Sequence, residues 1–416
     1  MMIRNIPVIL LTLYFFTFLI GNYQNAYDRI APQFVFISII NLLSLVYLLY
    51  IKNIHEIFKN IKKSNLLLSY TAYISISCIS LFVAQNLPEG LIVLSQYLTF
   101  FVTLICIYQL STSLKVNFLN VFSVLLISSI AIECYGVLSY AYEHFLVEGI
   151  AFNRSNDLSG YSGNINVVSF SITAKFPILL YYMYKSQNKM FLIFISILIF
   201  SSSLVVFLLL SRGAFIALMF VVAVYVVSTI IKDQIKSLIK PAIILITIFS
   251  SYIFVQGFVD QSDNSNVISE RVESIVNIED DSISDRINYY SDAIQSISLN
   301  PILGIGIGNW KFYSIKYDYE TMSDYVVPIY VHNDFLHVAA EIGIIGVIFF
   351  ILIFYFFMRN SYKIMKKQDF ALGLTLGCMM SVYIIDSMLN FPISRPISHM
   401  FLIFLLIASI NSNSND

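Results

Sequence analysis

The chain has 416 residues, of which 58% are hydrophobic and only 12% are charged, and its formal net charge is −1. This composition is typical of a membrane protein, and the near-zero charge gives no indication of nucleic-acid binding. The four cysteines lie inside apolar segments, at spacings that fit neither a zinc site nor a disulfide framework, so redox chemistry is not expected.

Apolar segments of roughly 15–25 residues, the length that crosses a bilayer, recur along the whole chain. In chain order they predict about twelve spans, at 7–21, 33–51, 66–84, 90–110, 117–139, 164–184, 190–210, 213–231, 241–258, 335–358, 370–389 and 396–410. The first segment has no small-residue cleavage site and is expected to remain as a helix. The predicted fold is therefore an all-α polytopic integral membrane protein, with 1–416 as a single transmembrane domain.

The basic residues indicate an orientation. Lysine-rich connections alternate with lysine-poor ones, and they lie at 52–63, 185–189, 232–240 and 359–367. By the positive-inside rule these connections are cytoplasmic, which places the N-terminus in the cytoplasm. The opposite connections carry mostly arginine, whose planar guanidinium suits bidentate recognition of phosphate. The sequence thus predicts an anion site on the outer face.

A polar segment at 259–334 falls on the same outer side and is too long to be a mere connector. Within it, "SDRINYYSDAIQSISLNP" predicts an amphipathic helix that starts after Ser284 as N-cap and ends at Asn300-Pro301. The apolar positions of this helix recur at helical spacing: Ile287, Tyr290, Ile294 and Ile297. We expect the helix to lie along the outer membrane–water boundary.

Three residues on the outer side are candidates for chemistry. Arg212, between two apolar segments in "LLLSRGAFIAL", is either a snorkelling residue that ends a helix or a phosphate-binding arginine that faces a cavity. Arg286 is either a solvated charge or a second phosphate ligand. His332 lies just before the 335–358 span. It is either a helix-capping or interfacial residue or a general base, since the pKa of histidine lies near the working pH.

Other motifs have simpler interpretations. His337 lies five residues after His332, roughly 140° around a helix, which disfavours a paired-histidine metal site. The acidic residues Asp280, Asp281 and Asp285 are expected to be solvated rather than to hold a cation. The glycines of "GIGIGNW" follow no strand, so they indicate turns or close packing and not a dinucleotide loop.

Ionisable residues inside predicted spans are functional candidates by default because burying a charge in a bilayer is costly. Lys175 and Asp386 are two such residues. Both are weaker candidates than the outer arginines and histidine, and Asp386 lies near the outer end of its span.

Taken together, the motifs resemble a known family. The motifs are "NPILGIGIGNW", followed by "VHNDFLHVAAEIGIIG" and preceded by "DRINYYSDAI", together with "SRG" between two spans and "GYSGNINVVSF" at 160–170. As a set they resemble the O-antigen ligase and O-antigen polymerase family of bacterial envelope glycan assembly. The resemblance is sharpest over 205–350.

The resemblance implies a metal-independent glycosyltransferase that needs no cofactor. Such an enzyme transfers a glycan from an undecaprenyl-diphosphate-linked donor to an acceptor hydroxyl, on lipid A core or another glycan, at the periplasmic face of the bacterial inner membrane. His332 would be the catalytic base, and Arg212 and Arg286 would bind the diphosphate. The remaining motif residues and the intramembrane lysine are candidate supporting residues: Asn164, Asn166, Lys175, Asn333 and Glu341.

Two alternatives stay open. A polymerase that joins repeat units shares the same motifs, because it differs only in its acceptor. A transporter of lipid-linked oligosaccharide is also polytopic, but it should concentrate charged and helix-breaking residues near the midplane, often in two related halves. Here these residues concentrate at the outer ends and in one loop, which favours the enzyme.

Overall fold

The computed structural model describes residues 5–21, 30–52, 64–150, 156–233, 239–260, 281–318 and 327–413. Within these ranges all regular secondary structure is helical. A helix satisfies its backbone hydrogen bonds internally, which is required where no water is present to replace them, so apolar segments of this length fold as helices. The expected all-α architecture is confirmed.

Ten helices in the described part of the chain are long and apolar enough to cross a membrane. They are α2 (Ala31–Ile51), α4 (Asn65–Ser80) with η4 (Leu81–Val83), α5 (Leu87–Thr112), α6 (Phe118–Ala141) with η5 (Tyr142–Val147), α7 (Ile165–Lys175) with α8 (Pro177–Lys185), α9 (Lys189–Leu208), α10 (Arg212–Asp233), α11 (Ile239–Asp260), α15 (Asp334–Lys367) and α16 (Phe370–Leu389). Two shorter apolar helices occupy the other expected spans: α1 (Ile6–Phe15) with η2 (Phe16–Leu19), and α17 (Pro396–Asn413).

Two predicted spans are interrupted, 335–358 by a break in α15 at Gly343 and 164–184 by a proline. The sequence predicts continuous helix over 164–184, whereas the structure divides it at Phe176 into α7 and α8. Pro177 causes the division because it lacks a backbone N–H and its ring displaces the preceding turn. The two pieces still span together, with α7 ending at Lys175.

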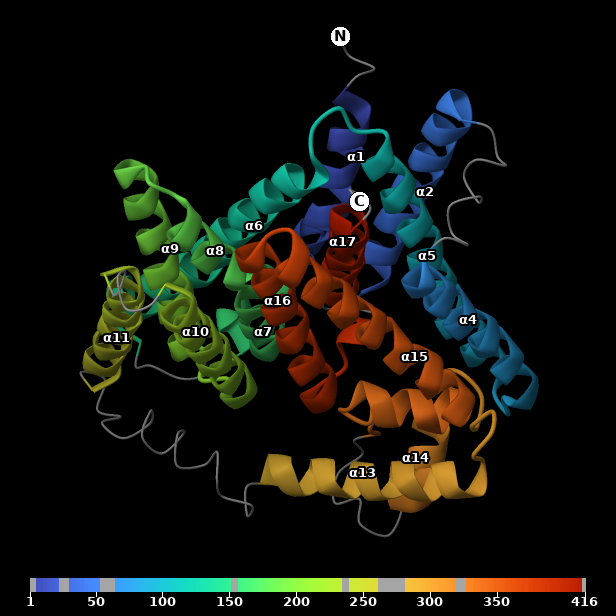
Figure 1. Cartoon of the computed structure of the whole chain (residues 1–416). Helices are drawn as coiled ribbons and strands as arrows, with labels where there is room; N and C mark the ends of the chain where they lie inside the picture. The colour runs from blue at the N-terminus through green and yellow to red at the C-terminus, as the bar shows by residue number, and fades with distance from the viewer. Residues whose placement is uncertain are drawn as a thin grey trace.

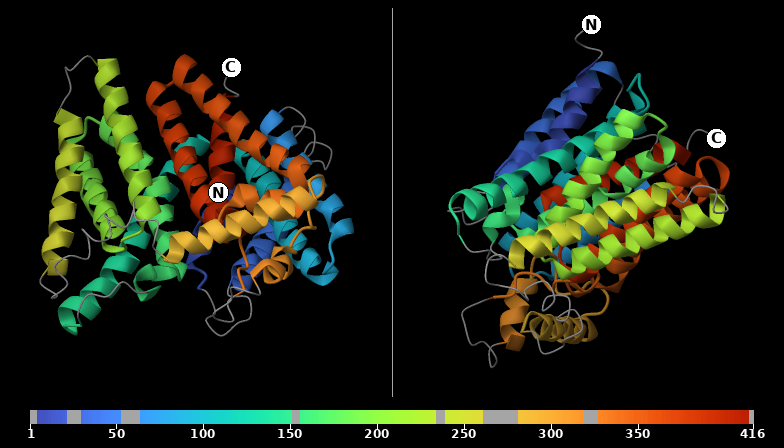
Figure 2. Two further views of the ribbon diagram at one scale, coloured as in Figure 1. Left: turned by 90° about the horizontal axis from the view of Figure 1, so that it is seen from below. Right: turned by 90° about the vertical axis from the view of Figure 1, so that its left-hand side faces the viewer.

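The C-terminal helix α17 lies at the centre of the bundle (Figure 1). Nearly every residue from Met400 to Ile410 is buried, and α17 packs against α5, α6, α15 and α16. Figure 2 shows the other spanning helices grouped around it, with α9, α10 and α11 on one flank. Packing on all sides explains why α17 is apolar around its whole circumference.

Two helices lie across one end of the bundle instead of within it. In Figure 1 α13 (Asp281–Leu299) and α14 (Trp310–Asp318) lie below the spanning helices, at the end away from the start of α1 and the end of α17. The sequence correctly predicts α13, but its start was placed wrongly: the helix begins at Asp281, so Ser284 is an internal residue and not the N-cap.

The helix α13 presents apolar residues outward as well as inward. Tyr290, Ala293 and Ile297 pack against the protein, whereas Ile287 and Ile294 are 51% and 58% exposed. Residues seven apart lie on one helix face, so the two isoleucines form a single apolar edge. The predicted position along a membrane surface stays a prediction.

The loop 301–309 joins α13 to α15 through backbone hydrogen bonds. A break in α15 at Gly343, where φ is 78°, leaves carbonyls free in the preceding turn. The N–H groups of Ile305 and Gly306 donate to the carbonyls of Ala340 and Glu341, both at 2.9 Å. A Cβ atom on Gly304 would overlap the Ala340–Glu341 backbone. The predicted close-packing role of these glycines is therefore confirmed.

Candidate active site

His332 lies in the short connection that leads into α15. The N-cap of α15 is Asn333, whose side-chain oxygen accepts from the N–H groups of Phe335 and Leu336 at 3.0 and 3.1 Å. Capping is thus performed by Asn333, and the imidazole of its neighbour remains available for chemistry. Among the described residues only Leu210 and His332 are non-glycine residues with positive φ, at 50° and 60°. Such strained backbone is concentrated at functional sites.

Aromatic rings hold the imidazole of His332. The Tyr289 ring stacks on it with centroids 6.2 Å apart, and Phe391 meets it edge-on at 5.0 Å. Nδ1 is buried and makes no hydrogen bond to the residues that the structure describes. The ring is therefore oriented by packing and by its backbone, without the carboxylate partner that commonly orients a basic histidine.

A tyrosine hydroxyl joins three elements at this point. The Tyr290 hydroxyl on α13 lies 3.1 Å from the His332 carbonyl and 3.1 Å from the Met388 carbonyl near the end of α16. Arg286 lies one turn before Tyr290 on the same helix. This contact fixes α13 over the site, so that Arg286 and His332 come together although 46 positions separate them in the numbering.

The environment of His332 favours the neutral imidazole. Burial lowers its pKa from the usual range to about 4, and the charges of Arg286, Arg395 and His337 act in the same direction. At neutral pH the ring is therefore unprotonated and can accept a proton.

A cavity of about 60 Å³ opens beside His332. Its walls come from four separate parts of the chain: the start of α7, the connection before α15, the end of α16, and the connection through η7 (Pro392–Ser394) into α17. The polar residues that line it are Asn164, Asn166, His332, Asp386, Asn390, Arg395 and Ser398.

Arg212 begins α10 next to this cavity. The Ser211 hydroxyl donates to the side-chain oxygen of Asn166 at 3.0 Å, which ties the start of α10 to the cavity wall. A Cβ on Gly213 would contact Leu389 and Phe170, so α10 packs tightly against the ends of α16 and α7. Arg212 is not itself a lining residue of the cavity, but its backbone is held at the cavity's edge.

The candidate supporting residues separate into two groups. Asn164 and Asn166 line the cavity, and the side chain of Asn164 also caps α7 by accepting from the N–H groups of Asn166 and Val167. Glu341 does not line it. Its carboxylate accepts from the N–H groups of Gly308 at 2.8 Å and Trp310 at 2.9 Å, so it fixes the loop 301–309 to α15.

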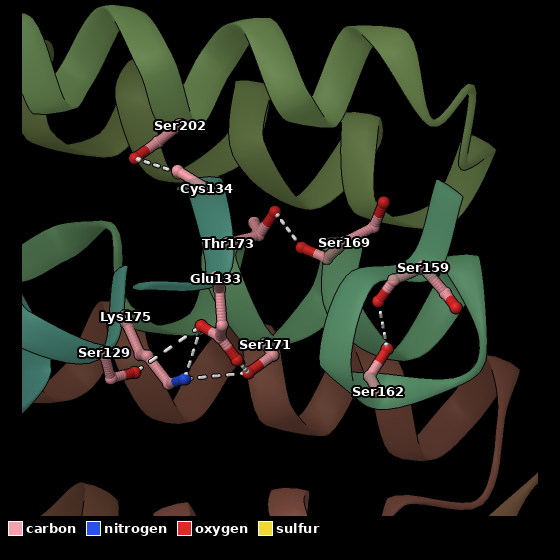
Figure 3. A network of polar contacts seen from close by, with 10 residues as sticks. All are labelled: Ser129, Glu133, Cys134, Ser159, Ser162, Ser169, Ser171, Thr173, Lys175 and Ser202. Atoms are coloured by element: carbon pink, nitrogen blue, oxygen red, sulfur yellow. Dashed lines mark hydrogen bonds and ion pairs between the residues drawn. The ribbon is translucent and has the colours of Figure 1, made fainter. Parts of the chain in front are cut away.

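Lys175 is far from the cavity, nine residues further along α7 than Asn166. Figure 3 shows its ammonium group between Glu133 and Ser171. The Nζ atom lies 2.7 Å from the Glu133 carboxylate and 2.8 Å from the Ser171 hydroxyl. Both charged side chains are almost fully buried. This ion pair joins α6 to α7, and no described contact connects it to His332.

Sequence reasoning gave no role to Arg395, Asn390 or Phe391. Arg395 is one of the arginines of the outer connections, and Asp386 is the weaker functional candidate that lines the cavity. A signal was present in "LNFPISRP", where an arginine and an aromatic residue occur together in a short connection between two apolar helices. Asp280 of the acidic segment lies outside the described residues.

The fold and the site together define a polytopic helical membrane protein with a polar, arginine-bearing site at one end of its bundle. Residues 195–351 match the sequence model of the O-antigen ligase family. This stretch runs from α9 into α15 and contains Arg212, Arg286 and His332. The resemblance expected from the motifs is thereby confirmed over that stretch, whereas the cavity walls from α7, α16 and α17 lie outside it.

Two curated proteins are similar to part of the chain. One, described as a "Putative polysaccharide ligase" of Rickettsia felis, is 33% identical over 95 residues, which are 21% of this chain and 22% of that protein. Another with the same description, from Rickettsia conorii, is 30% identical over 89 residues, 20% and 21% of the two chains. The aligned part thus spans about a fifth of the length of each relative.

Proposed function

We propose that this protein transfers a glycan from an undecaprenyl-diphosphate-linked donor to an acceptor hydroxyl, with His332 as general base and with Arg212 and Arg286 binding the diphosphate. The observation that carries the proposal is that the charge of Arg286 acts on a neutral His332, which lines a polar cavity. The match to the O-antigen ligase family and the two polysaccharide ligase relatives support ligase-type glycan transfer.

The reaction is a single displacement. The His332 imidazole accepts the proton of the acceptor hydroxyl while that oxygen forms a bond to the anomeric carbon of the donor sugar. The bond between this carbon and the diphosphate oxygen breaks, and undecaprenyl diphosphate leaves with the bonding electron pair. The guanidinium groups stabilise the negative charge that grows on the leaving group. Diphosphate is a good leaving group, so its negative charge must be neutralised but need not be protonated. In this proposal the arginines neutralise it, and the step requires no metal and no cofactor.

The acceptor separates a ligase from a polymerase. A ligase uses a hydroxyl of lipid A core or of another surface glycan, and a polymerase uses a growing glycan on a second lipid carrier. The ligase descriptions of both relatives favour the first acceptor. We further propose that the protein lies in the bacterial cytoplasmic membrane with 259–334 and the site on the periplasmic side.

The test is transfer by purified protein in detergent, with undecaprenyl-diphosphate-linked glycan, a chelator, and either lipid A core or a second lipid-linked glycan as acceptor. His332→Ala should lower kcat about 10²- to 10⁴-fold and leave donor binding intact. His144→Ala is the matched control, because His144 is a partly exposed histidine outside the cavity.

Unchanged transfer by His332→Ala would remove this residue from the mechanism. Transfer lost on chelation would contradict the metal-free step. If the protein, reconstituted into lipid vesicles, moves the lipid-linked donor across the vesicle membrane without transferring the glycan, the transporter would be favoured instead.

A further inference from the structure

Arg395 is held in an aromatic stack beside His332. Its guanidinium carbon lies 4.3 Å from the centroid of the Phe391 ring. The Tyr330 ring also stacks on Phe391 and is nearly parallel to it, with centroids 4.1 Å apart. Stacking occupies a face of the guanidinium and leaves the N–H groups on its edge free to donate. The side chain is therefore fixed in orientation without its donors being used.

These donors have no protein partner among the described residues. Arg395 forms no ion pair within 4.0 Å and no side-chain hydrogen bond in the described part of the chain. Two carboxylates lie near enough to act on the guanidinium electrostatically, Asp386 and Asp334. Their described hydrogen bonds are to other groups: Asp386 accepts from the Asn390 amide at 2.7 Å, and Asp334 accepts from the Ile393 N–H at 3.1 Å. A partly buried cation with five unused donors is costly unless a ligand satisfies them.

The cavity that Arg395 lines defines the size and chemistry of this ligand. At about 60 Å³ it is a small cavity. Asn166, Asn390 and the carboxyl group of Asp386 add polar side chains to the wall, which His332 also lines. A compact anion such as a phosphoryl group fits both the volume and the guanidinium, which binds phosphate through two parallel N–H donors.

We infer that Arg395 is a third phosphate-binding arginine, which holds a phosphate of the lipid-linked donor in the cavity beside His332. This inference rests on the proposed function. Arg286 approaches the imidazole from α13, whereas Arg395 approaches it from the connection between α16 and α17, so the bound diphosphate would contact both. Arg395 lies outside the stretch that matches the O-antigen ligase family.

A consequence follows for the base. Arg286 and Arg395 both disfavour the protonated imidazole in the free protein. A bound diphosphate would neutralise these charges and raise the affinity of His332 for a proton. Donor binding would thereby strengthen the base at the moment when it is needed.

The experiment measures binding of glycan-free undecaprenyl diphosphate to the full-length purified protein and to Arg395→Gln and Arg395→Lys. We expect Arg395→Gln to weaken binding about 10- to 100-fold, the effect of losing one or two charge-assisted hydrogen bonds. Arg395→Lys should also bind less well, because lysine cannot donate in two parallel directions. Arg359→Gln, at the exposed far end of α15, is the matched control and should bind like the parent.

Two further measurements separate phosphate binding from a structural role and from general attraction of anions. Modification of His332 by diethyl pyrocarbonate, followed against pH, should show a higher pKa in Arg395→Gln than in the parent, since one neighbouring positive charge is gone. Binding of phosphatidylglycerol, a lipid phosphate from another source, should change less than twofold.

Binding of undecaprenyl diphosphate by Arg395→Gln at the affinity of the parent would overturn the inference, as would an unshifted His332 pKa. Equal weakening for both lipids would also overturn it, because Arg395 would then be a general anion attractor. If the parent itself does not bind undecaprenyl diphosphate, the proposed function fails instead, so the two failures are distinguishable.

Discussion

At the scale of single residues, the most informative feature is a histidine without a carboxylate partner. In the described residues Tyr289 and Phe391 hold the His332 ring, and the charges nearest to it are positive. A carboxylate would raise the pKa of the ring, whereas burial and arginines lower it. The site is therefore built so that the imidazole is neutral before the donor arrives.

This arrangement predicts a pH dependence with a definite sign. Because the pKa of free His332 is about 4, the neutral form predominates throughout the neutral range, and kcat/KM should be constant from about pH 6 to 8 and fall only in more acidic buffer. With donor bound, the diphosphate raises the pKa, so the acid limb of kcat should lie at higher pH than that of kcat/KM. Full pH profiles of transfer test this; coincident limbs would contradict it.

A second prediction at this scale distinguishes phosphate recognition from membrane anchoring. An anchoring arginine needs only a positive charge on a flexible stem, whereas a diphosphate ligand needs the planar guanidinium. Arg212→Lys and Arg286→Lys should each reduce kcat/KM about 10- to 100-fold with little change in protein level. The double variant should lose less than the product of the two, because both side chains act on one group.

Arg359→Lys is the control for these variants, since Arg359 is exposed at the opposite end of α15. Full activity of both single lysine variants would remove the arginines from diphosphate binding.

At the scale of elements, the site depends on the hydrogen bonds between the loop 301–309 and α15 next to its break at Gly343. Glu341 is 2% exposed and accepts from the backbone N–H groups of Gly308 in the loop and of Trp310 at the start of α14. This contact fixes the first turns of α15, and with them the connection that carries His332.

Replacing this carboxylate should therefore affect stability and activity together. In Glu341→Gln one of the two N–H groups meets an amide donor instead of an acceptor, at a cost of about 1–3 kcal/mol. We expect a lower Tm in detergent and reduced transfer. His332→Ala, in contrast, should lower transfer at an unchanged Tm. An unchanged Tm for Glu341→Gln would show that the loop is held without this contact.

The buried ion pair between α6 and α7 gives another prediction. Removing one partner of a buried pair leaves an uncompensated charge, which costs about 3–5 kcal/mol, whereas removing both is much less costly. Lys175→Met should thus lower the Tm strongly, and Lys175→Met with Glu133→Gln should recover most of the loss. If the recovered double variant still transfers glycan, the pair is structural; if it is stable but inactive, Lys175 has a role in the reaction.

At the scale of the whole molecule, the arrangement of the helices makes orientation testable. Asn164 at the start of α7 lines the cavity, and the 21 residues of α7 and α8 run about 30 Å to the opposite end of the bundle. Gln187 follows α8 there, while Ser291 is exposed on α13 at the end that carries the site.

We therefore expect Ser291→Cys to react with a membrane-impermeant thiol reagent in intact spheroplasts and Gln187→Cys to react only after lysis. Both substitutions are made in a variant without the four native cysteines, because Cys78 is partly exposed. Reversed labelling would place the site in the cytoplasm and contradict the proposed donor.

Several features followed from the sequence because their causes are local. Each residue contributes its own free energy of transfer into hydrocarbon, so the spans could be located from short windows of sequence. The glycines at 304, 306 and 308 could be interpreted as close-packing residues because no strand precedes them. The start of α13 was placed wrongly because Ser284 has the residue type of a cap, although the helix continues before it to Asp281.

The tertiary structure alone decided which helix ends meet. Asn164 at the start of α7, Asp386 near the end of α16 and Arg395 before α17 come together with His332 around one cavity. Lys175, which the sequence allowed as a weaker candidate, is instead paired with Glu133. Membrane helices of similar hydropathy carry little local information about their neighbours, since their association depends on side-chain packing and polar contacts between them. The sequence therefore determined the spans and the chemistry available at their ends, and packing determined which of those groups form the cavity.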